Sequence, residues 1–547
     1  MVIIITQKRI FNEKNLNLFR DKLPTIDWSN IFKKGNTIDE NYLSFHLILT
    51  ETLNETIPIK KVKVKNCFKK PWLTPGIKKA CKNKRSLKIL TTHFNDILIN
   101  DYYKKYEKTL KKSVNISKRI HYIKKMHNSK NKTRTMWQII KERTNKINQK
   151  TKQNITLKNN NCSIIEPNNV ANTFNEYFLT VGSISDLNIK PRGRPVNSQA
   201  NNTIFVNPIS PKEVQLIINK LKNKTSCGFD EFPPVLIKHC TDLLVMPLTY
   251  LINQSFTEAS FPTVLKETII KPIPKSKATQ DVHQFRPIAL LSTFSKIFES
   301  AMCKQLTSFC EKHNIFDVNQ HGFRRKKSTI SALFEFTTEI MNIINNKKYA
   351  IGLMLDLSKA YDRVVHTILL DKLYGIGIRG QALNWLSSYL NNRQQCVEIE
   401  HYNNETQTLH SIKSKLLQLD HSIPQGSVLG CFLFLVYIND LPKIINNKSV
   451  LYADDISIVL SCNKTDDASM LVENILAPID DWLKDHNLEL NLSKTKLLQF
   501  KPRQKSALQT NIMFNNIPLE TVDYNSLLGV NFDFHITWKQ HIDKINI

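Results

Sequence analysis

Two adjacent carboxylates between apolar runs constrain this chain more than any other feature of its sequence. Asp454 and Asp455 lie between Ser449–Tyr452 and Ile456–Leu460, and both flanking runs are rich in β-branched residues. This pattern predicts a tight β-hairpin with its charge at the tip. Keeping both carboxylates ionised there is costly unless a cation lies against them. Taken alone, an acidic turn on an exposed hairpin is the simpler interpretation, so the function depends on partners elsewhere.

A third carboxylate, Asp356, ends a second predicted strand. Apolar Ile351, Leu353 and Leu355 alternate through the preceding residues, and a helical pattern resumes after the aspartate. A carboxylate at a strand end is compatible with a second metal ligand beside Asp454 and Asp455. Polymerases need such a site for two Mg²⁺ ions about 3.5–4 Å apart, and Mg²⁺ favours carboxylate oxygens.

A third stretch, Ser422–Gly430, lies between these two in the sequence. Pro424 and Gly426 interrupt regular structure just before an apolar run, Val428–Ile438, that predicts a helix. Gly426 permits close approach of the backbone to a substrate, and Gln425 offers both a hydrogen-bond donor and an acceptor. On its own, this is also the pattern of an ordinary turn before a helix.

The charge of the chain is unevenly distributed. The formal net charge is +30; residues 1–200 hold 40 Lys and Arg against 14 Asp and Glu, whereas residues 201–547 hold 37 against 33. A basic front half before a nearly neutral remainder indicates a polyanion-binding region beside a globular one. The alternative is a Lys-rich surface that reflects a biased overall composition.

The basic region contains a long predicted helix. Asp101–His127 has Lys side chains that can follow a phosphate backbone, although a solvated basic helix has the same pattern. Trp137 lies on a further amphipathic helix, where we expect it to be a packing anchor. Two polar stretches, Gln149–Asn161 and Ile189–Asn202, are typical of linkers, and a short apolar helix is predicted between them at Val170–Val181.

Cysteines and apolar runs bear on location. The ten cysteines are scattered, without a Cys-x-x-Cys pair or a Cys/His cluster at zinc spacing, so we expect reduced thiols in an intracellular protein. Val2–Ile5 is too short for a signal peptide, and Cys431–Ile438 is far shorter than a membrane span, so we expect no membrane partner. Basic runs such as Lys78–Lys88 are compatible with nuclear entry.

Together and in this order, the three stretches resemble motifs of reverse transcriptases. LDLSKAYD (355–362), PQGSVLG (424–430) and YADD (452–455) are similar to motifs A, B and C of that family. Further segments narrow the resemblance to non-LTR retrotransposons of the LINE type, most similar to the Jockey group. These segments are Lys271–Lys275, Phe285–Leu291 and Ser295–Glu299 (motifs 1 and 2), Gln320–Thr329 (an insertion before motif A), Leu488–Lys496 (motif D), Leu527–Asp533 (motif E), and, in the upstream linker, Pro71–Ile77, Phe174–Phe178 and Ser226–Pro233.

The resemblance implies an α+β fold: a right-hand polymerase with fingers, palm and an incomplete thumb, preceded by a mostly helical basic N-terminal region. The expected divisions are a helical N-terminal segment of unassigned function at 1–59, a basic helical linker and nucleic-acid-binding candidate at 60–204, fingers at 205–349, palm at 350–500, and motif E with the start of the thumb at 501–547. The reverse transcriptase domain itself would span about 255–533.

By motif position, the resemblance makes Asp356, Asp454 and Asp455 the catalytic carboxylates and metal ligands, with the backbone carbonyl of Leu357 as a further ligand. The cofactor would be Mg²⁺, two ions, with Mn²⁺ as a substitute. The reaction would be RNA-directed addition of dNTPs to a primer 3′-hydroxyl, so the expected partners are an RNA template, a DNA primer and dNTPs.

The resemblance also assigns residues around the nucleotide. Those expected at the incoming dNTP are Lys275, Arg286, Tyr361, Gln425 and Gly426. Tyr361 would be the aromatic gate that rejects a ribose 2′-hydroxyl, with core packing as the alternative. Asp362 would be a helix-start carboxylate and not a metal ligand. Either Lys494 or Lys496 would lie near the leaving pyrophosphate. Residues expected against template phosphates are Arg324, Arg325, Lys326 and Lys327, for which a solvated loop is the alternative.

Several residues depart from the family pattern. Cys227 and Glu231 replace the proline and the second glycine of a Ser-Pro-Gly-x-Asp-Gly stretch, Ala289 replaces a commoner serine, and Tyr361 stands where many relatives have Phe. None of these changes removes a catalytic group, although the first would weaken a template contact.

The ends of the chain depart further. No endonuclease is visible before the linker, and the chain stops where the first thumb helix should begin, so we expect a fragment or degenerate copy whose endonuclease activity comes from another protein. The nucleus is the favoured location for function. The main alternative is a catalytically silent RNA- and DNA-binding remnant. A viral RNA-dependent RNA polymerase is a distant third, because those enzymes usually show a Gly-Asp-Asp hairpin and no aromatic gate like Tyr361.

Overall fold

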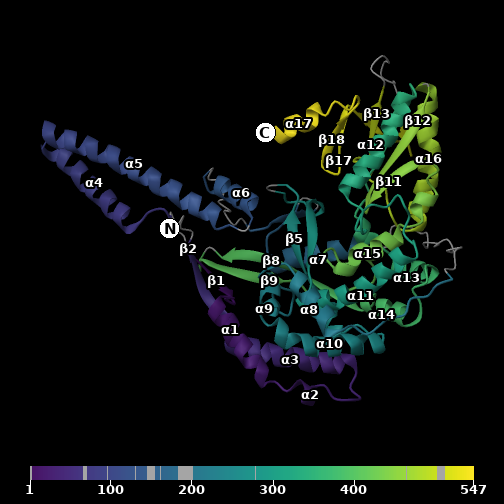
Figure 1. Cartoon of the computed structure of the whole chain (residues 1–547), viewed down its shortest axis with the longest axis horizontal. Helices are drawn as coiled ribbons and strands as arrows, with labels where there is room; N and C mark the ends of the chain where they lie inside the picture. Colours follow the sequence, from purple (N-terminus) through teal and green to yellow (C-terminus); the bar gives the residue numbers. More distant parts are fainter. Residues whose placement is uncertain are drawn as a thin grey trace. The chain divides into compact units, whose positions relative to one another are not determined.

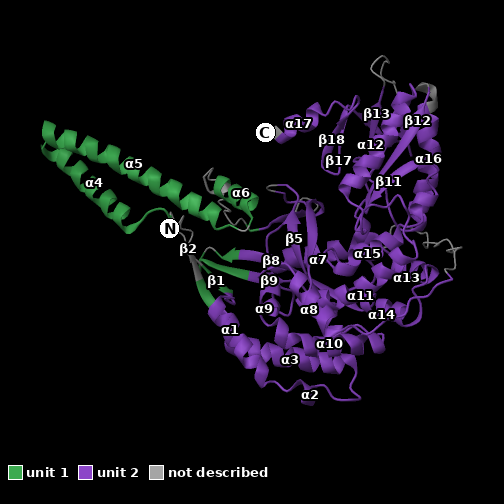
Figure 2. Ribbon diagram, viewed as in Figure 1, with its two compact units in different colours: residues 1–7, 61–154, 402–410 green, residues 8–60, 155–401, 411–547 purple. Residues whose placement is uncertain are grey.

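The computed structural model describes residues 3–65, 71–94, 96–129, 131–143, 154–159, 162–182, 201–276, 279–403, 405–463, 465–501, 512–515 and 517–546. Two compact units make up the chain (Figure 2). Residues 1–7, 61–154 and 402–410 form the first unit, and residues 8–60, 155–401 and 411–547 form the second.

A long helical hairpin dominates the first unit (Figure 1). Its elements are α4 (Pro75–Phe94), α5 (Ile97–His127) and α6 (Lys132–Arg143), together with strands β1 (Ile3–Lys8) and β2 (Lys60–Lys65). The Tyr106 hydroxyl donates to the Ala80 carbonyl (3.2 Å), and Lys84 pairs with Glu107 (2.5 Å), so α4 and α5 lie side by side. Strand β1 pairs in parallel with the start of β9 (Thr408–Lys413).

Two sequence predictions concern this hairpin. The helix predicted at Asp101–His127 is confirmed and begins earlier, at Ile97. The expectation that Trp137 is a packing anchor is wrong, because its side chain is 56% exposed. A helix of only three turns that packs along one neighbour buries one stripe of side chains, and the indole lies off that stripe.

A five-stranded sheet, the first sheet, belongs to the second unit and lies toward one end of it, beside α12 (Thr329–Asn345; Figure 1). Its strands, in spatial order, are β11 (Lys448–Tyr452), β12 (Asp455–Cys462), β7 (Tyr349–Leu355), β13 (Lys496–Phe500) and β16 (Glu520–Val522). Strand β7 is antiparallel to both neighbours, and every one of its residues is buried. Successive side chains point to opposite faces, so Ile351 and Leu353 join the main core while Ala350 and Met354 join a second cluster under α12.

A second sheet of the same unit is built from β10 (Leu417–Leu419), β8 (Arg393–Asn403), β5 (Glu267–Pro274) and β6 (Phe285–Leu290). Strands β5 and β8 are parallel, whereas β5 and β6 form an antiparallel hairpin. Helix α7 (Pro167–Thr180) covers this sheet, and the Phe174 ring lies 4.8 Å from that of Phe285. The helix predicted at Val170–Val181 is therefore confirmed.

The second unit contains further helices. They are α1 (Glu13–Lys22), α2 (Trp28–Ile31), α3 (Ile38–Thr56), α8 (Pro211–Lys220), α9 (Pro234–His239), α10 (Thr241–Thr257), α11 (Thr293–Lys312), α13 (His366–Gly375), α14 (Gly380–Leu390), α15 (Val428–Tyr437), α16 (Thr465–Asp485) and α17 (Lys539–Asn546). Short strand pairs are β3 (Leu157–Asn159) with β4 (Cys162–Ile164), β14 (Met513–Phe514) with β15 (Ile517–Pro518), and β17 (Tyr524–Leu527) with β18 (Val530–Asp533). The predicted linker Ile189–Asn202 lies almost wholly outside the described residues, while the end of the other, Gln149–Asn161, contains β3.

The N-terminal helices pack onto the body of the second unit. Phe45 of α3 packs edge-on against Phe294 of α11 (5.4 Å between centroids). Arg9 donates to Glu231 (2.6 Å), which adopts a left-handed backbone (φ 58°) at the position where the family pattern has glycine. A non-glycine residue in that region costs about 1–2 kcal/mol. The ion pair with Arg9, whose side chain is 9% exposed, offsets part of this cost.

Every cysteine that the structure describes with its side chain is a free thiol, as the scattered spacing predicts. No helix in the described ranges is both long and apolar enough to cross a membrane.

One buried carboxylate connects α11 to α15. Glu299 is fully buried, and its Oε2 accepts the N–H groups of Val428 (2.7 Å) and Leu429 (3.2 Å) at the start of α15. Ser295 donates to its other oxygen (2.7 Å). The carboxylate therefore satisfies two backbone donors that the helix itself leaves unpaired.

Glu299→Ala should destabilise the second unit by about 3 kcal/mol or more, because each unpaired buried N–H costs roughly 1–3 kcal/mol. Urea unfolding followed by fluorescence of the buried Trp385 and Trp482 measures this loss. The exposed Glu176→Ala change on α7 is the charge-matched control.

Burial raises the pKa of Glu299 above the ordinary value of 4.5. The contribution of Glu299 to stability therefore decreases as the pH rises from 4.5 through the pKa of the folded state. Glu299→Gln should therefore gain stability relative to the wild type between pH 4 and 7, and an equal pH dependence would contradict this assignment.

Candidate active site

The turn between β11 and β12 presents two carboxylates. Tyr452 pairs with Asp455, which leaves Ala453 and Asp454 as a two-residue turn. Ala453 has a left-handed backbone (φ 58°), as tight hairpin turns require at this position. The predicted hairpin is confirmed, and both Asp454 and Asp455 are exposed at its tip.

Strand register brings Asp356 to the same place. The antiparallel ladder between β12 and β7 runs as far as Ile456 opposite Leu355, so the next step places Asp455 opposite Asp356. Although both side chains reach solvent, partial desolvation by the surrounding chain raises the pKa of Asp454 and of Asp455. The charge of Asp454 raises the pKa of Asp455 further, and the charge of Asp356 raises both. Like charges gathered at one place favour uptake of a proton or of a cation.

A third chain segment flanks Asp356 on the other side. The Asp356 carbonyl accepts the Asn491 N–H (2.8 Å), and the Ser358 N–H donates to the Glu489 carbonyl (2.8 Å). Leu357 lies between these two bonds, in a bridge with Leu490. In an antiparallel pair, such an intervening residue directs its own carbonyl away from the partner segment. The Leu357 carbonyl therefore points toward the side on which β12 lies.

Lys494 and Lys496 have different partners. Lys494 Nζ lies 3.1 Å from Oδ2 of Asp356, and two thirds of its side chain is exposed. Lys496, the first residue of β13, instead pairs with Glu520 of β16. The structure thus separates two lysines between which the sequence offered no choice.

Tyr361 lies between a helix and the turn. Its ring stacks on Phe434 of α15 at 4.6 Å. Burial is the main cause that raises the pKa of Tyr361, followed by the Cys431 thiol and by the charge of Asp454. The ring is therefore packed against Phe434 and lies close enough to Asp454 to be affected by its charge.

Gln425 and Gly426 connect this region to the second sheet. Gln425 Nε2 donates to both carboxylate oxygens of Asp362 (2.9 and 3.0 Å), and its carbonyl accepts the Ala289 N–H (3.2 Å). Gly426 has φ 116°, a conformation that side chains rarely adopt. Burial raises the pKa of Asp362 to about 6, although the Gln425 hydrogen bond acts in the opposite direction.

Lys275 and Arg286 lie on the hairpin β5–β6 of the second sheet. Lys275 Nζ donates to the His283 carbonyl (3.0 Å), and Arg286 is exposed. The charge of Lys275 contributes to lowering the pKa of Lys359, after the larger effect of burial. Lys275 therefore lies near the chain just past Asp356.

The four cations predicted to contact the template divide into two pairs. Arg324 is 10% exposed and pairs with Glu311 (3.2 Å), and Lys327 Nζ lies 3.4 Å from Glu335. Arg325 and Lys326 are exposed. The first pair is thus held by protein carboxylates, and the second faces solvent.

Two contributors were missed by sequence reasoning. Tyr177 of α7 bonds to His283 Nδ1 (2.7 Å), and the Lys359 ammonium lies 4.5 Å from its ring, so an upstream helix contacts the region around the site. The stretch Phe174–Phe178 resembled the family linker, but its pattern gave no role for the tyrosine. Gln320 accepts a hydrogen bond from the turn residue Ala453 (3.0 Å), and nothing in the sequence marks this glutamine as a neighbour of residue 453.

Comparisons with known proteins show what the chain is similar to. The family model described as reverse transcriptase (RNA-dependent DNA polymerase) matches residues 273–531. The probable RNA-directed DNA polymerase from transposon X-element of Drosophila melanogaster is 26% identical over 346 residues, which is 62% of this chain and 37% of the relative.

Two further relatives from the same organism match similarly. The probable RNA-directed DNA polymerase from transposon BS is 27% identical over 355 residues (61% of this chain, 37% of the relative), and the RNA-directed DNA polymerase from mobile element jockey is 27% identical over 346 residues (62% and 36%). The chain spans little more than a third of the length of these relatives. Residues 273–531 are therefore a reverse transcriptase domain, and the chain is a homologue of the RNA-directed DNA polymerases of jockey-like non-LTR retrotransposons.

Proposed function

We propose that this chain is an RNA-directed DNA polymerase that adds dNTPs to a primer 3′-hydroxyl, with its palm at about 350–500 and its fingers at about 205–349. The observation that carries the proposal is the antiparallel register of β7 and β12, which puts Asp356 opposite Asp455 with Asp454 at the adjacent turn. The matched reverse transcriptase domain supports the same assignment.

The donors around the turn fit Mg²⁺. Within the residues described, no three His, Cys, Asp or Glu side chains form a ready-made metal cluster. Asp356, Asp454 and Asp455 therefore lie at neighbouring strand ends, but their side chains are not yet gathered around one point. The available donors are hard oxygen atoms, those of Asp356, Asp454, Asp455 and the Leu357 carbonyl. The pKa values of Asp454 and Asp455 are raised, and a bound cation would lower them by stabilising the ionised carboxylates. Two Mg²⁺ ions, or Mn²⁺ in their place, would supply positive charge to the attacking and leaving oxygens.

The remaining residues bind and orient the substrate. Lys275 and Arg286 would hold the triphosphate, because cationic donors stabilise charge on the phosphoryl oxygens. Lys494, beside Asp356, would donate a proton or a hydrogen bond to the leaving pyrophosphate. Tyr361, fixed by Phe434, would exclude a ribose 2′-hydroxyl.

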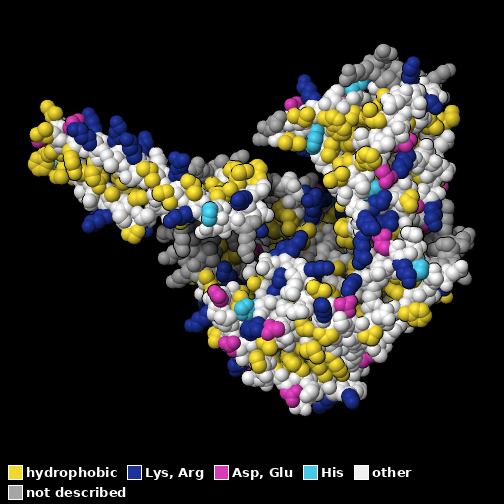
Figure 3. All heavy atoms as spheres, viewed as in Figure 1, with side chains coloured by type: hydrophobic (Ala, Val, Ile, Leu, Met, Phe, Trp, Pro, Cys, Tyr) yellow, Lys and Arg dark blue, Asp and Glu magenta, His cyan; other side chains and the backbone are white. Residues whose placement is uncertain are grey.

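The RNA template and the DNA primer fit the basic surfaces of both units. In the second unit, Lys and Arg side chains gather around a hollow in the face that Figure 3 shows. In the first unit, α4–α5 holds 15 Lys and Arg against 3 Asp and Glu within residues 75–127. Helix α5 has 31 residues and is therefore about 46 Å long, which is longer than one helical turn of a duplex. Exposed Arg325 and Lys326 are the cations that we assign to template phosphates.

Asp454→Asn should lower primer extension on an RNA template by about 100-fold or more, because it removes a metal ligand. Binding of the same RNA should remain unchanged at each salt concentration. Asp371→Asn, the same charge change at an exposed position of α13, should leave extension near the wild-type rate. Extension that survives in the Asp454 variant would refute the metal assignment. RNA binding without any extension by the wild type would favour a silent nucleic-acid-binding protein.

Lys494→Met should reduce kcat for extension by about tenfold to 100-fold, because it removes the cation beside Asp356. Lys496→Met removes the same charge two residues away and should change kcat by less than about twofold, since Lys496 pairs with Glu520. Single-turnover kinetics at saturating dNTP measure both rates. Equal losses in the two variants would contradict a specific role for Lys494.

Tyr361→Val should relax sugar selection, because it removes the ring that excludes the 2′-hydroxyl. The ratio of kcat/KM for a dNTP to that for the matching rNTP should fall by at least about tenfold. Tyr361→Phe keeps the ring and should keep the ratio. A ratio that does not change in the valine variant would show that Tyr361 only fills the core.

A further inference from the structure

The segment between α11 and α12 runs along the open edge of the first sheet, and we call residues 317–327 the support segment. The Asn319 carbonyl accepts the Leu451 N–H (3.0 Å), and the His321 N–H donates to the Leu451 carbonyl (2.8 Å). Gln320 thereby forms a parallel bridge with Leu451 of β11. The strand that leads into Asp454 is held on both sides, by β12 and by the support segment.

The side chain of Gln320 reaches the catalytic turn itself. Its Oε1 accepts the Ala453 N–H (3.0 Å) and the Gly322 N–H (2.8 Å), and the residue is 3% exposed. Ala453 is buried as well. Without Gln320, the N–H group next to Asp454 would be left with neither this acceptor nor ready access to water, which is unfavourable.

Gly322 makes this contact sterically feasible. A Cβ at residue 322 would lie 2.5 Å from the Ala453 nitrogen and 3.1 Å from the Tyr452 carbonyl carbon. Any side chain there would displace the turn. The support segment therefore approaches the backbone of the turn as closely as the absence of a side chain allows.

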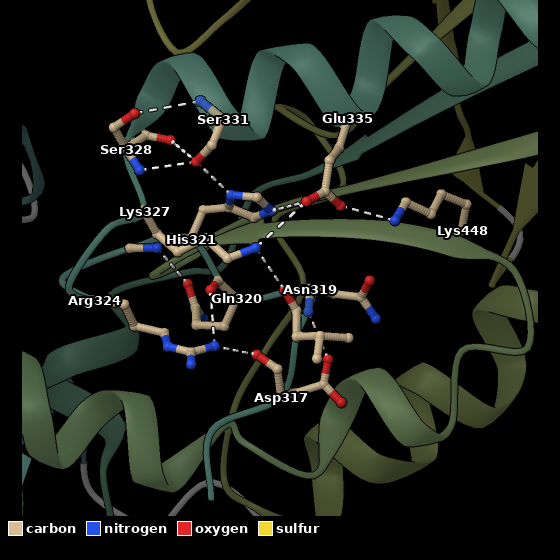
Figure 4. Close-up of polar contacts among 12 residues, drawn as sticks. Asp317, Asn319, Gln320, His321, Arg324, Lys327, Ser328, Ser331, Glu335 and Lys448 are labelled. Carbon is tan, nitrogen blue, oxygen red and sulfur yellow. Dashed lines mark hydrogen bonds and ion pairs between the residues drawn. The ribbon is translucent and has the colours of Figure 1, made fainter. Parts of the chain in front are cut away.

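One partly buried ion pair and several hydrogen bonds, some of them drawn in Figure 4, fix the support segment from one side. Arg324 donates to the Asp317 carbonyl (2.7 Å) and pairs with Glu311 of α11 (3.2 Å). The Asp317 N–H donates to Asn439 (3.0 Å), and the Asn319 N–H donates to the Asp317 side chain (2.9 Å). Residues 317–320 are thus tied to α11 and to the loop after α15.

Helix α12 fixes the segment from the other side (Figure 4). Glu335 lies 3.4 Å from His321 Nε2, 3.4 Å from Lys327 and 2.8 Å from Lys448 of β11. His321 Nδ1 bonds to Ser331 (2.8 Å). One carboxylate therefore joins the support segment to the same strand that carries the turn.

We propose that Gln320 is a positioning residue for the polymerase reaction, which places Asp454 by holding the backbone of Ala453. The inference rests on the proposed function of Asp454. Ala453 adopts a left-handed backbone that a non-glycine residue keeps only when its surroundings enforce it. The Gln320 hydrogen bond is an enforcing contact at that residue. This hydrogen bond explains why the support segment contains a buried glutamine. A role of the segment in binding template phosphates through its cations would not explain it.

Gln320→Met keeps the side-chain length and removes the acceptor. It should lower kcat for extension by about tenfold to 100-fold and raise the Mg²⁺ concentration needed for half-maximal rate, with the KM for dNTP and the affinity for RNA unchanged. Gln320→Glu keeps an acceptor oxygen and should retain more activity than the methionine variant. Gln305→Met is the matched control. Gln305 of α11 also makes two hydrogen bonds to backbone groups, in this case the carbonyl (2.8 Å) and the N–H (2.9 Å) of Asn207.

Hydrogen–deuterium exchange separates this proposal from the proposed function. In Gln320→Met, the peptide 449–456 should lose protection, and in Gln305→Met it should not. Unchanged exchange would overturn the contact, and lost protection with unchanged kcat and Mg²⁺ dependence would overturn the positioning role. A wild-type chain that extends no primer would instead count against the proposed function, while the exchange result would still decide whether Gln320 holds the turn.

Discussion

The antiparallel pairing of β7 with β12 is the constraint on which the site depends. It fixes the register by which Asp356 and Asp455 end up opposite each other, and the two-residue turn then sets Asp454 beside them. A shift of the register by one residue would turn the apolar residues of β12 to the wrong faces of the first sheet. The cores on both faces of β7 therefore hold the carboxylates together despite their mutual repulsion.

Segments outside the central strands complete the site. The segment that follows α16 supplies Lys494 and brackets Leu357, the support segment supplies Gln320, and α7 supplies Tyr177. Residue 177 lies well before the matched domain at 273–531. The N-terminal helices join the same core through contacts such as that of Phe45 with Phe294. Residues upstream of the matched domain are thus part of one packed body with it, within the second unit.

The sequence predicts the local elements well, because they depend on short-range patterns. Alternating apolar residues before Asp356, the hairpin around Asp454 and the apolar helix after Gly426 all form as expected. Long-range pairing is not encoded in such patterns. No local signal distinguishes Lys494 from Lys496, or marks Gln320 as the partner of a turn more than a hundred residues away. The exposed Trp137 shows the opposite failure, since a large apolar side chain on an amphipathic helix need not find a partner.

The central claim is that Asp356, Asp454 and Asp455 together hold divalent cations, and binding of Mn²⁺ measured by electron paramagnetic resonance tests it most directly. With primer, RNA template and dNTP present, the wild-type chain should bind two Mn²⁺ ions, and Asp356→Asn should lose at least one of them. The neutral side chain keeps the size of the aspartate, so loss of binding would report loss of the charged ligand. Equal stoichiometry and equal affinity in the two proteins would contradict the account.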